Sequence, residues 1–147
     1  MAVKPIPDGY HTITPYLVVP GAASVIEFLQ RAFGATEKHR MTEPGGRIMH
    51  AELLIGDSPL MLGEPPPDRP VITGMLYLYV PDVDATYQRA LAAGAKTIRE
   101  PHDEFYGDRT AAVKDHVGNQ WWIATHTKDV STQDLQKHAA LREKGEK

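Results

Sequence analysis

Apolar residues along the chain alternate between strand-like and helix-like spacing and predict an ordered series of elements. Residues 12–19 are rich in β-formers and end at Pro20-Gly21, so they predict a strand. Residues 22–33 carry apolar positions at helical spacing and stop at Gly34, which predicts a helix. Strands are then predicted over 36–42, 48–55 and 60–62.

A proline-rich stretch, 64–70, divides the chain in two. Proline lacks the amide donor that a helix or a central strand needs, so this stretch predicts a linker. Beyond it the order of strand, helix and three strands returns. These later elements are predicted over 75–80, 83–93, 96–99, 110–114 and 120–125.

Short matches between the halves indicate an internal duplication. Tyr16-Leu17-Val18-Val19-Pro20 returns as Tyr77-Leu78-Tyr79-Val80-Pro81, Gly34-Ala35 returns as Gly94-Ala95, and Ile55-Gly56-Asp57 returns as Val117-Gly118-Asn119. The nearly constant offset indicates one repeated β-α-β-β-β unit. We therefore predict a single domain with module one at about 10–64, a linker at 64–73, module two at about 74–126 and a C-terminal helix at about 131–142, capped by Ser131.

Charge and cysteine content narrow the possible functions. The formal net charge of −3 provides no basic field for nucleic acid, and no apolar run approaches the ~20 residues that a membrane span needs. The chain has no cysteine, which excludes disulfides, thiolate metal sites and a cysteine nucleophile. With no apolar signal stretch at the N-terminus, the simplest prediction is a cytoplasmic protein.

Several motifs, taken with the duplication, carry a family resemblance over residues 8–140. They are His50-Ala51-Glu52-Leu53, Val80-Pro81-Asp82-Val83-Asp84-Ala85, Phe105-Tyr106-Gly107-Asp108-Arg109 and Asp115-His116-Val117-Gly118-Asn119-Gln120-Trp121. The chain resembles the vicinal oxygen chelate superfamily (glyoxalase/bleomycin resistance protein/dioxygenase), and most closely its PhnB-like branch. The resemblance implies an α+β fold in which two βαβββ modules form a curved mixed-sheet cup, usually in a homodimer.

The metal ligands of the superfamily are missing. In metal-dependent members four ligands line the cup, and the resemblance places them here at Thr14, at Met75, at Leu60 or Met61, and at Trp122. Divalent metals need imidazole or carboxylate in a chain without thiolates. We therefore predict no metal at the standard site.

His50 and Glu52 are candidate catalytic residues. They lie two apart on a predicted strand, so both side chains point to one face, opposite an apolar face formed by Met49, Ala51 and Leu53. A neutral histidine beside a carboxylate can act as a general base pair or supply two ligands of a relocated metal site. The alternative is a half-solvated polar strand face, or a hydrogen bond across a dimer seam.

The loop 103–109 is a candidate ligand contact. Arg109 can form a bidentate contact to a carboxylate or phosphate, and Tyr106 can donate a hydrogen bond. The alternative is an Asp-Arg ion pair that fixes a tight turn at Gly107.

Aromatic residues share the predicted cup face. Tyr77 and Tyr79 have the parity of Met75, and Trp122 has the parity of Gln120 and His126. Together with Met61 and Thr14 they form an aromatic, apolar cleft of the composition that small-molecule pockets have. Alternatively Trp122 fills the cup as core, and Trp121, of opposite parity, is expected in the core on the helix side.

Two hypotheses follow. The first is a metal-free protein that binds a small molecule in an aromatic cup, comparable to the resistance members. The second is an enzyme of lyase, isomerase or dioxygenase type, with a divalent metal held by His50, Glu52 and another histidine.

Overall fold

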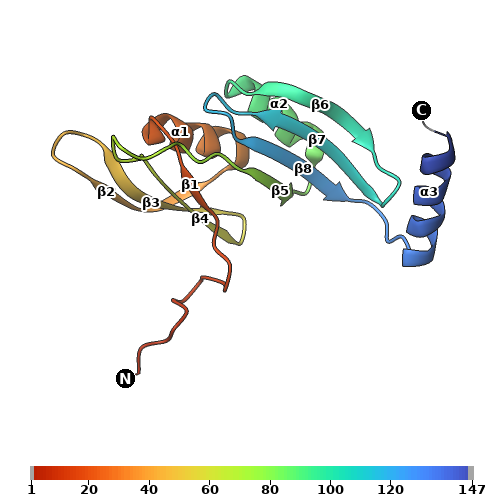
Figure 1. Ribbon diagram of the computed structural model, residues 1–147, viewed down its shortest axis with the longest axis horizontal. Helices are drawn as coiled ribbons and strands as arrows, with labels where there is room; N and C mark the ends of the chain where they lie inside the picture. The colour runs from red at the N-terminus through yellow and green to blue at the C-terminus, as the bar shows by residue number, and fades with distance from the viewer. Residues whose placement is uncertain (1, 146–147) are drawn as a thin grey trace.

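The computed structural model describes residues 2–145 and contains two βαβββ modules followed by a helix (Figure 1). Module one comprises β1 (Tyr16–Val18), α1 (Ala22–Phe33), β2 (Thr36–Thr42), β3 (Ile48–Ile55) and β4 (Ser58–Gly63). Module two comprises β5 (Met75–Tyr79), α2 (Val83–Ala92), β6 (Lys96–Asp103), β7 (Asp108–Lys114) and β8 (Gln120–His126), and α3 (Thr132–Gly145) follows. The predicted α+β class and the duplication are confirmed. Among the described residues, every helix is too short or too polar to cross a membrane.

Each module forms its own four-stranded mixed sheet with the same strand order. The orders are β1-β4-β3-β2 and β5-β8-β7-β6, with the first strand of each module parallel to its last and the other pairs antiparallel. Over residues 2–145 no ladder joins the two sheets. The chain therefore supplies two half-cups, whose parallel-paired strands β1 and β5 are edge strands, and β1 is covered at Val18 by a bridge to Ile72.

The two helices cover one face of the sheets and pack against each other (Figure 1). α1 buries Val25, Ile26 and Leu29 completely or nearly so. At its end, the Phe33 ring lies 5.3 Å from the ring of Trp121, which is fully buried. Trp121 is thus a core residue on the helix side, as its parity predicts.

The structure corrects some predicted boundaries. β1 begins at Tyr16 and not at residue 12, because Pro15 interrupts the extended segment. β6 continues past Arg99 to Asp103 despite Pro101, which is tolerated because β6 is an edge strand with irregular register. Met49 is 45% exposed, so it lies outside the apolar face that Ala51 and Leu53 form.

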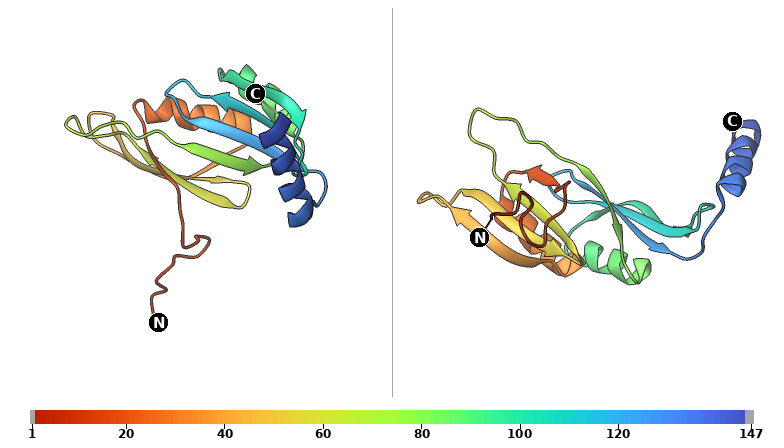
Figure 2. Two further views of the ribbon diagram at one scale, coloured as in Figure 1. Left: turned by 45° about the vertical axis from the view of Figure 1, so that its right-hand side comes forward. Right: turned by 90° about the horizontal axis from the view of Figure 1, so that it is seen from below.

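The C-terminal helix stands away from both modules (Figure 2). None of the described residues of α3 is buried. It contacts Phe105 of module two through His138, whose ring stacks on it with centroids 4.0 Å apart, and through Arg142, whose guanidinium lies 5.9 Å from the ring centroid. The segment before it is held at Gly107, whose carbonyl accepts from the amides of Thr127 and Lys128. A Cβ at Gly107 would lie 2.0 Å from the Lys128 carbonyl oxygen, so this approach needs glycine.

A buried carboxylate organises the turn between β7 and β8. Asp115 is 5% exposed and accepts hydrogen bonds from the amides of Val117 and Asn119, from the Asn119 side chain and from Trp121 Nε1. Asn119 in turn accepts from the Gly74 amide at 2.9 Å, which fixes the start of β5. The motif from Asp115 to Trp121 therefore has a structural role, because the side chains of Asp115, Asn119 and Trp121 are hydrogen-bonded within one turn.

Replacing Asp115 by alanine should destabilise the protein strongly. The change leaves the Trp121 and Asn119 donors buried without an acceptor, at an expected loss of about 3 kcal/mol in the free energy of unfolding. Urea denaturation measures this loss, with Asp68→Ala as a control, because Asp68 is exposed in the linker. A loss for Asp115→Ala no larger than that of the control would contradict this account of the turn.

Candidate functional site

The face of module two that the helices leave open has a floor of small residues. The strand register places Tyr77 beside Trp122, Trp122 beside Ala112, and Tyr79 beside Ala124. Ala112 and Ala124 are fully buried. The rings of Tyr77 and Tyr79 lie 5.4 Å apart. The three aromatic side chains thus lie beside the small, fully buried residues Ala112 and Ala124.

A buried carboxylate holds the two tyrosines. Asp108, the first residue of β7, is 4% exposed, and its Oδ2 accepts the hydroxyls of Tyr77 at 2.9 Å and Tyr79 at 3.2 Å. Its Oδ1 lies 2.8 Å from His126 Nδ1. Burial opposes ionisation, but the hydrogen bonds from His126, Tyr77 and Tyr79 outweigh it and hold the pKa of Asp108 below its ordinary value. Asp108 is therefore a carboxylate at neutral pH.

His126 is clamped between two carboxylates. Its Nε2 lies 2.8 Å from Asp129 Oδ1, while Nδ1 faces Asp108. Asp129 and then Asp108 raise the pKa of His126 above its ordinary value. An imidazole that donates to two carboxylates must carry both protons, so this geometry favours the imidazolium.

Tyr106 also interacts with Tyr77. Burial, followed by the neighbouring Tyr106 and Asp108, raises the pKa of Tyr77. Burial and Asp108 likewise raise the pKa of Tyr79. Both phenols therefore stay protonated over the physiological pH range.

The open face of module one carries Tyr16, His50 and Glu52. His50 Nε2 lies 2.8 Å from Glu52 Oε2, and His50 Nδ1 lies 3.1 Å from the Tyr16 hydroxyl. Burial, followed by the charge of His39, lowers the pKa of His50, so the ring is neutral at neutral pH. Its one proton then lies on Nε2 toward Glu52, and Nδ1 accepts from Tyr16. The predicted pair is thus joined and oriented.

Gly63 makes room for the Tyr16 side chain. A Cβ at this position would lie 2.5 Å from the Met49 carbonyl oxygen and 3.0 Å from the Tyr16 hydroxyl. Any larger residue would therefore push Tyr16 away from His50.

Two other residues predicted to contact a ligand, Met61 and Thr14, belong to module one. Met61 pairs with Glu52 and Tyr16 across β4, whereas Leu60 is buried in the core, which settles the register in favour of Met61. Thr14 lies in the segment before β1, where its hydroxyl is 3.5 Å from the His11 carbonyl oxygen.

Arg109 does not join the aromatic residues. Its guanidinium forms two bonds to Asp84, at 2.8 and 3.0 Å, and a third to Asp103 at 3.3 Å. The hydrogen bonds to Asp84 and Asp103 raise its pKa further. Neighbouring strand residues alternate between faces, so Arg109 points toward α2 while Asp108 points toward the tyrosines. The ion pair that the sequence left as the alternative exists, with Asp84 and Asp103 as partners.

The residues at the superfamily's metal positions do not fit a divalent metal. Thr14, Met75, Met61 and Trp122 offer one hydroxyl, two thioethers and an indole, none of which suits a hard or borderline cation. Within residues 2–145, no three His, Asp or Glu side chains lie together so that they could hold a metal. Both ring nitrogens of His50 and both of His126 already face hydrogen-bonding partners.

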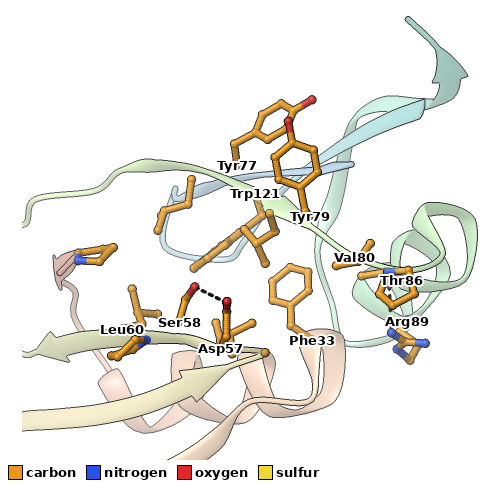
Figure 3. Close-up of a pocket in the computed structure, with 17 residues that line it drawn as sticks. Phe33, Asp57, Ser58, Leu60, Tyr77, Tyr79, Val80, Thr86, Arg89 and Trp121 are labelled. Atoms are coloured by element: carbon orange, nitrogen blue, oxygen red, sulfur yellow. Dashed lines mark hydrogen bonds between the residues drawn. The ribbon is translucent and has the colours of Figure 1, made fainter. Parts of the chain in front are cut away.

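A pocket of about 570 Å³ lies between the modules along β5 (Figure 3). Its walls include Phe33, Trp121, Leu60 and Ser58. Tyr77 and Tyr79 border it, but Figure 3 shows their hydroxyls directed away from Phe33. The pocket therefore follows the uncovered edge of β5 rather than the aromatic face.

Sequence reasoning did not select Tyr16 and Asp108, and it placed His126 on the predicted cup face without assigning it a role. The repeat could have identified Tyr16 as a cup residue, because Tyr16 of module one aligns with Tyr77 of module two. Strand alternation held one for Asp108, which shares the parity of Thr110 and Ala112 on β7. The contact between His126 and Asp108 follows only from the pairing of β7 with β8.

The clamp on His126 predicts a pH-dependent stability. Because folding raises its pKa, the clamp stabilises the protein fully below the unfolded pKa of about 6.5 and ceases to do so as the pH rises through the folded value. The urea midpoint of the wild type should therefore exceed that of His126→Ala by more at about pH 5.5 than at about pH 9. His11→Ala, which alters an exposed histidine, serves as control. A gap that widens with rising pH contradicts the clamp.

Comparisons with known proteins agree with this architecture. Residues 9–123 match the model of the Glyoxalase/Bleomycin resistance protein/Dioxygenase superfamily. Uncharacterized proteins Mb0911c of Mycobacterium bovis and Rv0887c of Mycobacterium tuberculosis are 35% identical over 91% of the chain and 94% and 84% of their own lengths.

Solved structures show the same fold. TioX from Micromonospora sp. ML1 superposes with a TM-score of 0.68 at 25% identity, over 79% of this chain and 98% of that one. A glyoxalase/bleomycin resistance protein/dioxygenase family enzyme from Burkholderia phytofirmans gives a TM-score of 0.60 at 20% identity, over 78% and 95%. With most of both modules matched by the family model, the chain belongs to the Glyoxalase/Bleomycin resistance protein/Dioxygenase superfamily.

Proposed function

We propose that the protein is a cytoplasmic, homodimeric member of the PhnB-like branch that binds a small organic molecule against the aromatic face of module two, without a metal. The observation that carries the proposal is the floor of Ala112 and Ala124 flanked by Tyr77, Tyr79 and Trp122. Apolar surroundings with a few directed polar groups are typical of small-molecule sites. The absence of cysteine supports the cytoplasmic location.

The free edge of β5 supports the homodimer. Gly74 and Val80 hydrogen-bond to β8, and alternate residues of a parallel strand face its partner. Met75, Tyr77 and Tyr79 therefore present their amides and carbonyls to the open edge. Met75–Tyr79 contains no charge and no proline, the features that normally protect an edge strand.

We propose that a second copy of the chain pairs with this edge. β1 is the corresponding edge of module one, where Ile72 of the linker pairs with both the amide and the carbonyl of Val18 and would have to make way for a partner strand there. With β1 of one protomer along β5 of its partner, the two half-cups form one curved cup. Tyr16, His50 and Glu52 would then face Tyr77 and Trp122 across the cleft.

Blocking the edge amide should prevent dimerisation. Met75→Pro removes an amide that does not bond to β8, and Met75→Ala removes the same side chain but keeps the amide. Light scattering should find Met75→Ala dimeric, and Met75→Pro with a dissociation constant raised at least about tenfold, since one lost edge bond and proline's bulk disrupt the ladder. A dimer of unchanged affinity in Met75→Pro would exclude this edge as the interface.

Ligand binding can be measured with a neutral aromatic probe, naphthylmethanol, by calorimetry. Trp122→Ala should weaken binding about tenfold, because one aromatic contact contributes on the order of 1–1.5 kcal/mol. Asp68→Ala, in the exposed linker, should change the affinity less than about twofold. Equal affinities for the wild type and Trp122→Ala would remove the aromatic face as the site.

A catalytic role is the second candidate, favoured by the oriented Tyr16, His50 and Glu52. The neutral imidazole, oriented by Glu52, can take the Tyr16 proton on Nδ1 while the Tyr16 oxygen accepts a proton from a bound substrate. Elemental analysis after dialysis against Ni²⁺, Zn²⁺, Mn²⁺ or Fe²⁺ distinguishes a metal-dependent enzyme from a metal-free one. Near-stoichiometric metal that His50→Ala loses would identify a metal-dependent enzyme of lyase, isomerase or dioxygenase type.

A further inference from the structure

Resting on the proposed binding function, we infer that the cup selects ligands whose polar end donates hydrogen bonds, above all a protonated amine on an aromatic or apolar frame, and rejects carboxylates and phosphates. The inference follows from where the protons of Tyr77, Tyr79 and Tyr16 are directed. It concerns the chemical class of the ligand, which neither the fold nor the aromatic composition specifies.

In module two both tyrosine hydroxyl protons point inward. A carboxylate can only accept hydrogen bonds, so Tyr77 and Tyr79 must each donate to Asp108 Oδ2. What each hydroxyl offers outward is therefore its oxygen lone pairs. Tyr77 is 41% and Tyr79 66% exposed, so a ligand can reach both. Because a phenol has a single proton, an anionic ligand that needs a donor would have to break a bond to a buried charge.

Module one repeats this polarity. The Nε2 proton of neutral His50 is directed to Glu52, so Nδ1 takes the Tyr16 proton. Tyr16, 45% exposed, thus also offers only lone pairs. A tyrosine hydroxyl can in general donate or accept a hydrogen bond. Here all three tyrosines, on both half-cups, offer a ligand only acceptors.

Three of the nearby cationic side chains are already paired. Arg109 is bound by Asp84 and Asp103 on the opposite face of the sheet. Arg99, opposite Ala112 in the register, lies 3.3 Å from Glu104 Oε1. His126 is held between Asp108 and Asp129. An anion entering the cup would compete with a carboxylate for each of these groups, whereas an ammonium meets tyrosine oxygens and ring faces, which attract cations.

Three probes on one ring system test the inference: naphthylmethylamine, naphthylmethanol and naphthylacetate, titrated by calorimetry at neutral pH into the full-length protein. The amine should bind at least about tenfold more tightly than the acetate, with the alcohol between them. Tyr79→Phe removes one acceptor and keeps the ring, and it should narrow the ratio of amine to acetate affinity about threefold or more. Asp108→Asn should narrow it as well, and Asp68→Asn, in the exposed linker, should leave it unchanged.

The outcomes separate this inference from the function on which it rests. Acetate binding as tight as amine binding in the wild type overturns the inference and leaves an aromatic binding site intact. The inference also fails if the amine preference survives unchanged in both Tyr79→Phe and Asp108→Asn. If none of the three probes binds the wild type, the binding function is wrong and the inference fails with it. The wild-type ratio decides even where Asp108→Asn does not fold.

Discussion

Alternation of side chains along the strands is the constraint on which this protein depends. Each sheet commits one face to the helices, where Leu53, Leu62, Trp121 and Ile123 are fully buried. Every second residue is then left on the other face, whatever its chemistry. His50 and Glu52 come to lie together in this way, and so do Tyr77 and Tyr79. The core thus fixes the register of both half-cups, and a one-residue slip would bury their polar groups.

Local patterns predicted the elements well but not the partnerships between them. The bounds of α1, β2 and β3 follow from spacing and from glycine stops, because those signals are local. Strand parity predicted that Tyr77 and Trp122 face the cup, and in the structure they pair in the register of β5 and β8. Neither pattern reveals that Asp108 meets His126, since this contact depends on how β7 and β8 pair.

The contact of Arg109 with Asp84 is another partnership that local patterns could not predict. The residue type and loop position of Arg109 suggested anion binding, but Asp84, 25 residues earlier on α2, takes up the guanidinium. Within the loop the sequence offered Asp103 and Asp108 as partners, and it could not show which face of the sheet Arg109 would occupy. Two residues of one motif, Asp108 and Arg109, thus serve opposite faces. The first orients the tyrosines, and the second fastens the sheet to its helix.

The link from Asp129 through His126 to Asp108 has a practical meaning for anyone who handles the chain. Asp129 belongs to the connection to α3, yet it helps set the charge of the imidazole that contacts the carboxylate beneath the tyrosines. Trimming the protein after β8 to obtain a compact fragment would remove this outer carboxylate. The shortened fragment would then have an altered ligand face, although every strand and both module helices were kept.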